Sequence, residues 1–322
     1  MRLGCWLSSE EHPPRDLVRL AVEAEQVGFG DAMISDHFHP WTPTQGQSGF
    51  VWSTLGAIAH ATDTLRVATG VTAPIVRMHP AVVAHAATTV ASMMPGRFAL
   101  GLGSGERLNE QVTGERWPRA GERRRMLSEA IDVIRKLFTG DEVNHSGQYF
   151  QVEHAQLFTR PDTPPPIYVA AGGRRSTELA GEKGDGLIVT SPDPVVIQQF
   201  EHAGGRGKPK IAQLHVCWAD TEREAVDTAM RWWPNSALPG TAKSELARPS
   251  DFASLADLVT EPALRKQVVC GPDPDAHLAA IARYAGAGFT LLHIHQVGPD
   301  QQGFLRFYEK EILPQFPAVS SA

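Results

Sequence analysis

Cysteine is scarce in this sequence, and its three residues form no pattern. Cys5, Cys217 and Cys270 lie far apart, and no pair has the C-x-x-C spacing of a zinc or redox motif. An odd number of cysteines also leaves no complete disulfide framework. The sequence therefore predicts free thiols, as expected for a protein in the reducing cytoplasm.

Long apolar runs and an excess of basic residues are also missing. No run of 18 apolar residues occurs, and the start "MRLGCWLSSEEHPPR" has no apolar stretch like that of a signal peptide. A formal net charge of −6 argues against a large nucleic-acid-binding surface. With 42% hydrophobic and 20% charged residues, the composition is that of a soluble enzyme. We expect a small-molecule substrate, and neither a nucleic-acid partner nor a membrane.

Short apolar segments alternate with segments of helical periodicity along the chain. In the first helical segment, Leu17, Leu20, Ala21 and Ala24 recur at helical spacing, and Gly28 marks its end. Eight segments are predicted as buried strands, four before residue 105 and four after residue 165. They are "RLGCWLS", "DAMISDH", "LRVATGV", "GRFALGLGSGE", "PIYVAAG", "GDGLIVTS", "KIAQLHVCW" and "TLLHIHQV".

The alternation of strand and helix, with apolar runs in place of period-two alternation, favours a parallel sheet covered by helices. Eight units over 322 residues favour a closed (β/α)8 TIM-like barrel, with an open doubly wound sheet as the alternative. We expect a single barrel domain over residues 1–322. Two insertions are predicted: about 140–165, with the hairpin-like "NHSGQYFQV", and about 235–265, a Pro-, Ser- and Ala-rich candidate lid.

The active site of such a barrel lies at the carboxyl ends of its strands. Polar or glycine-rich stretches follow most of the predicted strands here. In chain order they are Ser8 to Glu10, "SDHFHPW" (35–41), "TGVTAP", "GSGERLNE", "AAGGRRS", "TSPD" (from Thr190), and the pair His295 and Gln296. An acid, a base, glycine-rich backbone and arginine are therefore expected on one face.

The stretch "SDHFHPW" allows three interpretations. His37 and His39, two residues apart, are compatible with a metal site, although further ligands would have to come from elsewhere. His37 is also compatible with a buried structural histidine. A general base is favoured, because His37 ends a strand beside Asp36, which can orient or charge the ring. Trp41 would then wall the pocket, and His39 would be structural.

Two glycine-rich stretches suggest a cofactor. "GLGSGE" fails the dinucleotide fingerprint because its sixth residue is Glu106, but its small residues let a flat ring approach the backbone. Glu106 would face that ring, with Asn109 nearby, although a helix-capping role is the alternative. In "AAGGRRSTELAG", Gly172 and Gly173 precede a predicted helix whose first N–H groups, with Arg174 or Arg175, favour a phosphate.

Taken together, these stretches resemble the coenzyme F420-dependent oxidoreductases of the luciferase-like superfamily, in the group of the F420-dependent glucose-6-phosphate dehydrogenases. The resemblance covers almost the whole chain. It is carried by "SDHFHPW", "TGVTAPIVRMHPAVVA", "MMPGRF", "LGLGSGE", "PIYVAAGG", "GDGLIVTS" and "HQVGPDQQGFLRFYEKEILP". The resemblance implies a TIM-like barrel with an insertion, a homodimer, and the deazaflavin F420 as the cofactor that exchanges hydride.

The resemblance also implies roles for matched residues. His37 would take the proton of a substrate hydroxyl, Trp41 would stabilise developing charge, and Glu106 would be the acid at the deazaflavin ring. The implied cofactor contacts are Asp36, Gly70, Val71, Ala73, Ser104, Gly105, Asn109, Gly172, Gly173, Arg175 and Ser176, with a cis peptide bond between Gly70 and Val71. The expected substrate contacts are Glu10, Thr190 and Lys266, and no metal is expected.

Two departures from the group bear on the substrate. Relatives that oxidise a sugar phosphate place a cation where this chain has Asp193, and only Lys266 matches another member of that cationic cluster. Ala73 replaces a threonine that contacts the cofactor. We therefore expect hydride transfer between F420 and an alcohol or sugar-type hydroxyl, or the reverse carbonyl or enone reduction, and not glucose 6-phosphate. The alternatives are an FMN-dependent monooxygenase and a non-catalytic cofactor-binding barrel.

Overall fold

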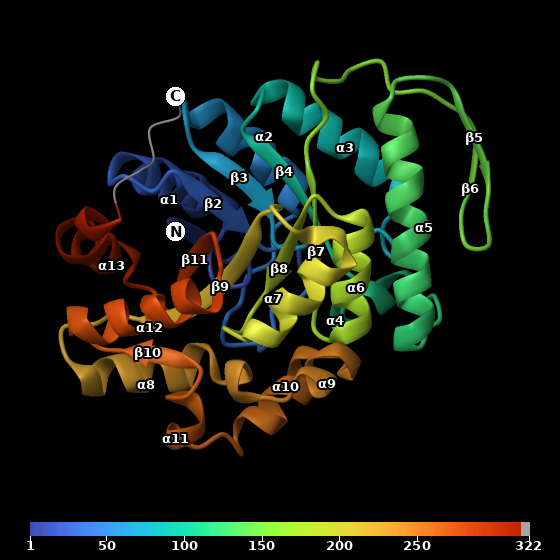
Figure 1. The fold of residues 1–322 in the computed structure, drawn as a ribbon. Coiled ribbons are helices and arrows are strands. Elements are labelled where there is room, and N and C mark those ends of the chain that lie inside the picture. Colours follow the sequence, from blue (N-terminus) through green and yellow to red (C-terminus); the bar gives the residue numbers. More distant parts are fainter. Residues whose placement is uncertain (317–322) are drawn as a thin grey trace.

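A closed barrel of parallel strands forms the centre of the molecule, as the computed structural model shows for the described residues 1–316 (Figure 1). The strand order is β10-β9-β11-β1-β2-β3-β4-β7-β8, and pairing of β8 with β9 closes eight strands into the barrel. These are β1 (Arg2–Leu7), β2 (Asp31–Ile34), β3 (Arg66–Thr69), β4 (Phe98–Leu102), β7 (Ile167–Ala170), β8 (Gly186–Val189), β9 (Lys210–Cys217) and β11 (Leu291–Gln296). The predicted (β/α)8 barrel is confirmed, and the open sheet is wrong. Residues 317–322 of the expected domain lie outside the described residues.

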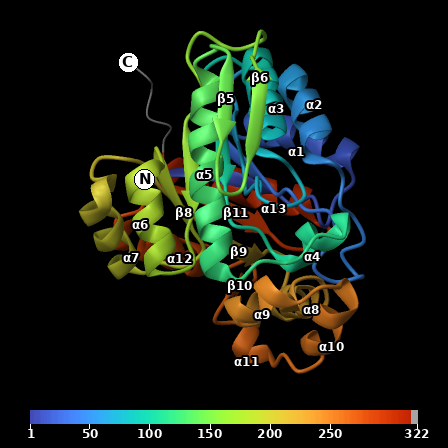
Figure 2. The same cartoon turned by 90° about the vertical axis from the view of Figure 1, so that its right-hand side faces the viewer.

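Helices surround the barrel along its sides and at one end (Figures 1 and 2). They are α1 (Pro14–Gln26), α2 (Val51–Ala61), α3 (Pro80–Met93), α4 (Arg107–Glu110), α5 (Ala120–Phe138), α6 (Arg174–Lys183), α7 (Pro194–Phe200), α8 (Glu222–Trp232), α12 (Pro274–Ala287) and α13 (Gln301–Phe307), with short turns η1 (Gln111–Thr113), η2 (Glu201–Gly205), η4 (Tyr308–Ile312) and η5 (Leu313–Gln315). Within the described residues, none of these helices combines the length and apolar character needed to span a bilayer.

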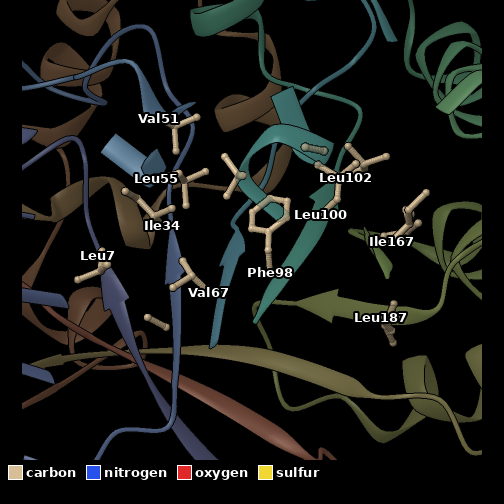
Figure 3. Packing of buried hydrophobic residues seen from close by; sticks show 14 of the residues in the cluster. Leu7, Ile34, Val51, Leu55, Val67, Phe98, Leu100, Leu102, Ile167 and Leu187 are labelled. Atoms are coloured by element: carbon tan, nitrogen blue, oxygen red, sulfur yellow. The ribbon is translucent and has the colours of Figure 1, made fainter. Parts of the chain in front are cut away.

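Apolar side chains fill both faces of the sheet, which explains the continuous apolar runs of the strands. On the outer face, Leu7, Ile34 and Val67 are buried together with Val51 and Leu55 of α2 (Figure 3). The barrel interior holds a separate small cluster. Its buried members are Met33, Ala68, Ala99, Ile188, Ile211 and Leu291.

The helical spacing seen in the sequence corresponds to burial. Leu17, Leu20, Ala21 and Ala24 are the buried residues of α1. Gly28 follows the helix with φ of 104°, and the N–H of the next residue, Phe29, donates back to the Ala24 carbonyl. This is the left-handed ending that glycine allows at low cost.

Two excursions leave the barrel. In the first, β5 (Val143–Ser146) and β6 (Gln151–Ala155) form an antiparallel hairpin beside α5 (Figure 2). The second, over the 235–265 region, is a chain of short helices. They are η3 (Pro234–Ala237), α9 (Gly240–Glu245), α10 (Pro249–Ala256) and α11 (Glu261–Leu264). Both views place α8 to α11 together at one end of the barrel, next to α4 (Figures 1 and 2).

A ninth parallel strand, β10 (Val268–Cys270), follows this helical segment and was not predicted. It pairs with the last three residues of β9, from His215 to Cys217. Three residues are too few to produce a recognisable pattern in the sequence.

Candidate active site

His37 lies just past the end of β2 and has one ring nitrogen free. Its side chain is buried, with 8% exposed. Nδ1 lies 3.1 Å from the carbonyl oxygen of His39, and Ser48 Oγ donates to the backbone carbonyl of His37 itself (2.7 Å). Because a carbonyl only accepts, Nδ1 carries the proton in the neutral ring. Nε2 is then the acceptor, as a general base requires.

Glu10, after β1, faces that free nitrogen. Its Oε1 lies 3.5 Å from His37 Nε2, and both side chains are buried. Ser8 Oγ donates to Glu10 Oε2 (3.1 Å), and Ser35 Oγ donates to the same oxygen. Burial alone would raise the pKa of Glu10, but His37 and the Ser35 hydroxyl together hold it below its usual value. Glu10 is therefore a carboxylate that can stabilise a protonated His37.

Asp36 has different partners from those expected. Its Oδ1 accepts from Arg77 (2.8 Å) and its Oδ2 from the Thr72 hydroxyl (2.7 Å). The prediction that Asp36 orients the His37 ring is wrong, because its carboxylate is bound by residues that follow β3. Glu10, which was expected at the substrate, is the carboxylate beside the ring.

Arg77 and Glu110, for which the sequence predicted no role, complete this buried cluster. Glu110 Oε2 accepts from the backbone N–H of Arg77 (2.9 Å), and Oε1 lies 3.6 Å from Arg77 Nε. Burial raises the pKa of Glu110 to about 7, and the charges of Glu106 and Asp36 add to the effect against the attraction of Arg77. The position of Glu110 within "GSGERLNE" was the one available signal.

Asn109 fixes the loop that carries His37. Its side-chain oxygen accepts from the N–H groups of Phe38 (3.0 Å) and His39 (3.2 Å), and only 1% of the residue is exposed. His39 Nδ1 donates to the Leu108 carbonyl (2.9 Å), so its predicted structural role is confirmed. The loops after β2 and β4 are thus held together by three hydrogen bonds.

Glu106 directly precedes α4, at the N-cap position, but its side chain does not cap the helix. Its side chain makes no capping hydrogen bond, so the capping alternative is wrong, and its carboxylate is 3.5 Å from Asn109 Nδ2. Gly105, with φ of 68°, lies so close to Glu110 and Ala73 that an added Cβ would be 2.8 Å and 3.1 Å from them. The half-buried Ser104 precedes this tight turn.

The peptide bond between Gly70 and Val71 is cis, as the resemblance predicted. It follows β3 and lies under the β4 loop, because a Cβ on Gly103 would be 2.6 Å from Val71 Cγ2. Thr72 then pairs with Leu102 as an isolated bridge. Val71 and Ala73 therefore adjoin the loop that runs from Gly103 to Glu106.

Aromatic rings cover His37 from the outside. The Trp41 ring centre lies 4.8 Å from that of His37, tilted by 58°, and the Phe252 ring of α10 packs edge-on against Trp41 at 5.2 Å. Phe252 of the 235–265 segment thus packs against the pocket wall that Trp41 forms.

A second buried polar set lies at the ends of β9 and β11; the sequence placed His295 at a strand end but predicted no role for Glu11 or His215. His295 Nε2 is 2.9 Å from Glu11 Oε2, and the other Glu11 oxygen accepts from the Gly298 N–H (2.8 Å). The His215 ring centre is 5.1 Å from that of His295, and the Trp233 ring packs edge-on against His295 at 4.5 Å. Imidazoles therefore line the barrel mouth on this side as well.

The glycine pair after β7 is open to solvent. Gly172 and Gly173 are exposed, and a Cβ on either would meet no atom within 4 Å. Both of their N–H groups donate to Ser176 Oγ at 3.2 Å, which shapes the start of α6. Arg175 is exposed beside them. The arrangement leaves room for an anion above the start of the helix.

The residues that bear on a sugar phosphate do not form a cationic cluster. Asp193 caps α7 by accepting from the Val195 N–H (2.9 Å). Thr190 is exposed at the end of β8, and Lys266 is exposed on the turn between α11 and β10. Within residues 1–316, no group of three or more His, Cys, Asp or Glu side chains is placed to hold a metal ion.

This fold and these strand-end residues define a luciferase-like barrel. Residues 1–291 match the family model described as luciferase-like monooxygenase, and the chain belongs to this family. The family recognised from the sequence motifs is thereby confirmed.

Its most informative relatives are F420-dependent enzymes. The chain is 37% identical to the F420-dependent glucose-6-phosphate dehydrogenase of Nakamurella multipartita, over 99% of this chain and 97% of that protein. It is 36% identical to the enzyme of the same name from Beutenbergia cavernae, over 99% of this chain and 98% of that protein. An F420-dependent secondary alcohol dehydrogenase, solved with an F420-acetone adduct, superposes with a TM-score of 0.90 at 29% identity, over 97% and 98% of the two chains.

Proposed function

We propose that this protein is an F420-dependent oxidoreductase that transfers hydride between coenzyme F420 and a secondary alcohol or sugar-type hydroxyl, or catalyses the reverse carbonyl or enone reduction. One observation carries the proposal: His37 Nε2, the ring nitrogen that His39 does not contact, lies 3.5 Å from the buried carboxylate of Glu10. The F420-dependent relatives supply the cofactor in this proposal.

The residues at the strand ends fit a deazaflavin. The crowded turn at Gly105 and the Gly70–Val71 pair would give a flat ring close access to the backbone. The open Gly172–Gly173 pair, with Arg175 and Ser176, would hold the anionic tail. Asp36, Asn109, Ala73 and Ser104 complete the proposed cofactor surface.

Bound F420 would supply the hydride acceptor, and the side chains would manage the proton and the charge. His37 Nε2 takes the proton of the substrate hydroxyl, and Glu10 stabilises the resulting imidazolium. Trp41 keeps water from the ring. Glu106, which is not used for capping, donates or holds the proton on the cofactor side.

The substrate of this proposal is not glucose 6-phosphate. Asp193 places a carboxylate at the start of α7, where the resemblance implies a cation in enzymes that oxidise a sugar phosphate, and Lys266 is exposed without an ion-pair partner in the described residues. Asp193 would repel a phosphate dianion, and Lys266 would be the one member of this cluster to attract it.

Reduction of F420, followed at its visible absorbance band, against alcohols, sugars and sugar phosphates tests the proposal. We expect turnover with at least one alcohol, and loss of about 10²- to 10⁴-fold in kcat for His37→Ala with F420 binding retained. Full activity in that variant would contradict the base assignment. Activity confined to sugar 6-phosphates would contradict the interpretation of Asp193.

Titration of protein fluorescence with F420 and with FMN separates the alternatives. Tight FMN binding without F420 binding would favour a monooxygenase. F420 binding without turnover across the panel would favour a non-catalytic barrel.

We also propose a cytoplasmic homodimer. The three cysteines are free thiols, in keeping with a reducing compartment. Phe50, Val82 and Met93 are exposed apolar side chains in the α2 and α3 region, as a subunit interface would need. Light scattering on the purified protein would give the mass that checks this assembly.

A further inference from the structure

Lys243 is a half-buried cation with no acidic partner. Its Nζ makes one hydrogen bond, a long one of 3.4 Å to the backbone carbonyl of Ser236. No carboxylate forms an ion pair with it in the part of the chain that the structure describes. A half-buried ammonium group without a counter-ion is unfavourable unless a ligand provides the negative charge.

The helix that carries Lys243 is held in a fixed position. Arg123 of α5 binds Glu245 (3.1 Å), and Trp117 Nε1 donates to the same carboxylate (3.1 Å). Gln111 Nε2 donates to the carbonyl of Ala247, just past the helix, and α9 packs against α4. These contacts keep Lys243 next to the loop of Glu106.

His215 is a second polar group without a protein partner. It belongs to β9, four residues after Ile211 of the barrel interior, so it faces the inside near the mouth. Its ring is half-buried, and neither ring nitrogen makes a hydrogen bond within residues 1–316. Burial lowers the pKa of His215 well below its usual value, so the ring is neutral and has one N–H to donate.

Trp233 and the turn after it bring these two groups together. The Trp233 ring centre is 5.8 Å from that of His215, and η3 starts at the next residue. Ser236, the hydrogen-bond partner of Lys243, lies in that turn, and its own buried hydroxyl has no partner in the described residues. The Ser236 N–H donates to the Trp233 carbonyl (3.1 Å), so Lys243 is linked through Ser236 and Trp233 to the ring of His215.

We infer that Lys243 and His215 form a subsite for the carboxylate of the substrate. One ammonium charge and one neutral N–H match a monoanion, whereas a phosphate dianion would need further cations. The inference rests on the proposed function and names its substrate class. The substrate is a hydroxy acid whose C–H hydride leaves to the cofactor and whose hydroxyl proton goes to His37, giving an oxo acid with its carboxylate unchanged.

The test compares acids with their uncharged amides on the F420-loaded enzyme. Lactate, 3-hydroxybutyrate and 4-hydroxypentanoate vary the distance between hydroxyl and carboxylate, and lactamide and the other two amides are the matched neutral substrates. We expect at least one acid to exceed its amide about tenfold or more in kcat/KM. Lys243→Met should lower this ratio to about one, chiefly through a higher KM for the acid.

Three further variants sharpen the result. Lys243→Arg should keep much of the ratio, since the charge remains, and His215→Phe should lower it. Lys310→Met, at a side chain that is 83% exposed, is the control and should leave the ratio unchanged.

Each adverse outcome has a distinct meaning. Turnover of neutral alcohols with equal kcat/KM for every acid and amide would overturn the subsite and leave the proposed function intact. A higher F420 dissociation constant for Lys243→Met, without a change in the ratio, would assign Lys243 to the cofactor and also overturn it. Absence of F420 binding by the unmodified protein would overturn the proposed function and the subsite with it.

Discussion

Glu10 is the residue whose change should separate charge stabilisation from binding. Glu10→Gln keeps the hydrogen bonds of Ser8 and Ser35 but removes the negative charge next to His37 Nε2. We expect kcat to fall on the order of 10- to 100-fold, less than on removal of the base itself. The acidic limb of the pH–rate profile should move to lower pH, since the protonated imidazole loses its counter-charge. An unshifted profile would show that Glu10 has only a packing role.

Asn109 offers a second test at this scale. Asn109→Ala leaves the buried N–H groups of Phe38 and His39 without their acceptor. We expect a loss of about 1–3 kcal/mol in the free energy of unfolding, measured with urea, and a lower kcat because the His37 loop loosens. Asn109→Asp retains the acceptor oxygen and should lose less stability. Equal losses in the two variants would argue against this hydrogen-bonding role.

The sequence identified the residues that follow the strands, but not their pairing. His37, Glu106 and Asn109 were found because strand ends in a barrel meet on one face. The pairing of Asp36 with Arg77, and of His37 with Glu10, depends on which side chains turn toward each other across neighbouring loops. Adjacency in sequence favoured Asp36 for His37, whereas the fold brings Glu10 from another strand.

Among the elements, α9 makes the clearest prediction. Arg123 holds this helix through Glu245, and its guanidinium stacks on the Trp117 ring at 4.2 Å. Arg123→Met should speed amide hydrogen exchange over residues 240–247 and raise KM, while F420 affinity stays near its original value. The exposed Arg116, which pairs with Glu122, is the matched control. Arg116→Met should leave both the hydrogen-exchange rate over residues 240–247 and the KM unchanged.

The elements differ in how far sequence predicts them. The helix α1 and the eight barrel strands were predicted because periodicity and apolar runs report burial directly. The short helices of the 235–265 segment were not, since each has eight residues or fewer and little periodicity of its own. Their positions depend on distant contacts, such as that of Phe252 with Trp41. The relation between Lys243 and His215 could not be predicted for the same reason, because these residues are far apart in the sequence and approach each other through the packing of the 235–265 segment.

For the whole molecule, Glu110 makes stability depend on pH. Its pKa is raised by burial from 4.5 to about 7, with Arg77, Asp36 and Glu106 as the charged neighbours. Because the pKa of Glu110 is higher in the folded protein, its contribution to the free energy of unfolding is fully present below pH 4.5. This contribution is lost as the pH rises through about 7. Compared with Glu110→Gln, the unmodified protein should therefore lose on the order of 1–3 kcal/mol of unfolding free energy between about pH 5 and about pH 8.

Urea unfolding of both proteins at these two pH values measures the difference. Glu309→Gln, at an exposed carboxylate, is the control and should follow the unmodified protein. A Glu110→Gln curve parallel to that of the unmodified protein would contradict the assignment.

The double pairing of β9 has a consequence for how such a barrel can change its specificity. The first residues of β9 pair with β8 and close the barrel, whereas its last three pair with β10. The chain leaves at Cys217 and returns at Val268 beside the same strand. Residues 218–267 thus form a cassette anchored at both ends on one strand, and their length and composition can vary without changing the strand-to-strand pairing of the closed barrel. Exchanging this cassette between relatives is a direct route to new substrate preferences on an unchanged cofactor platform.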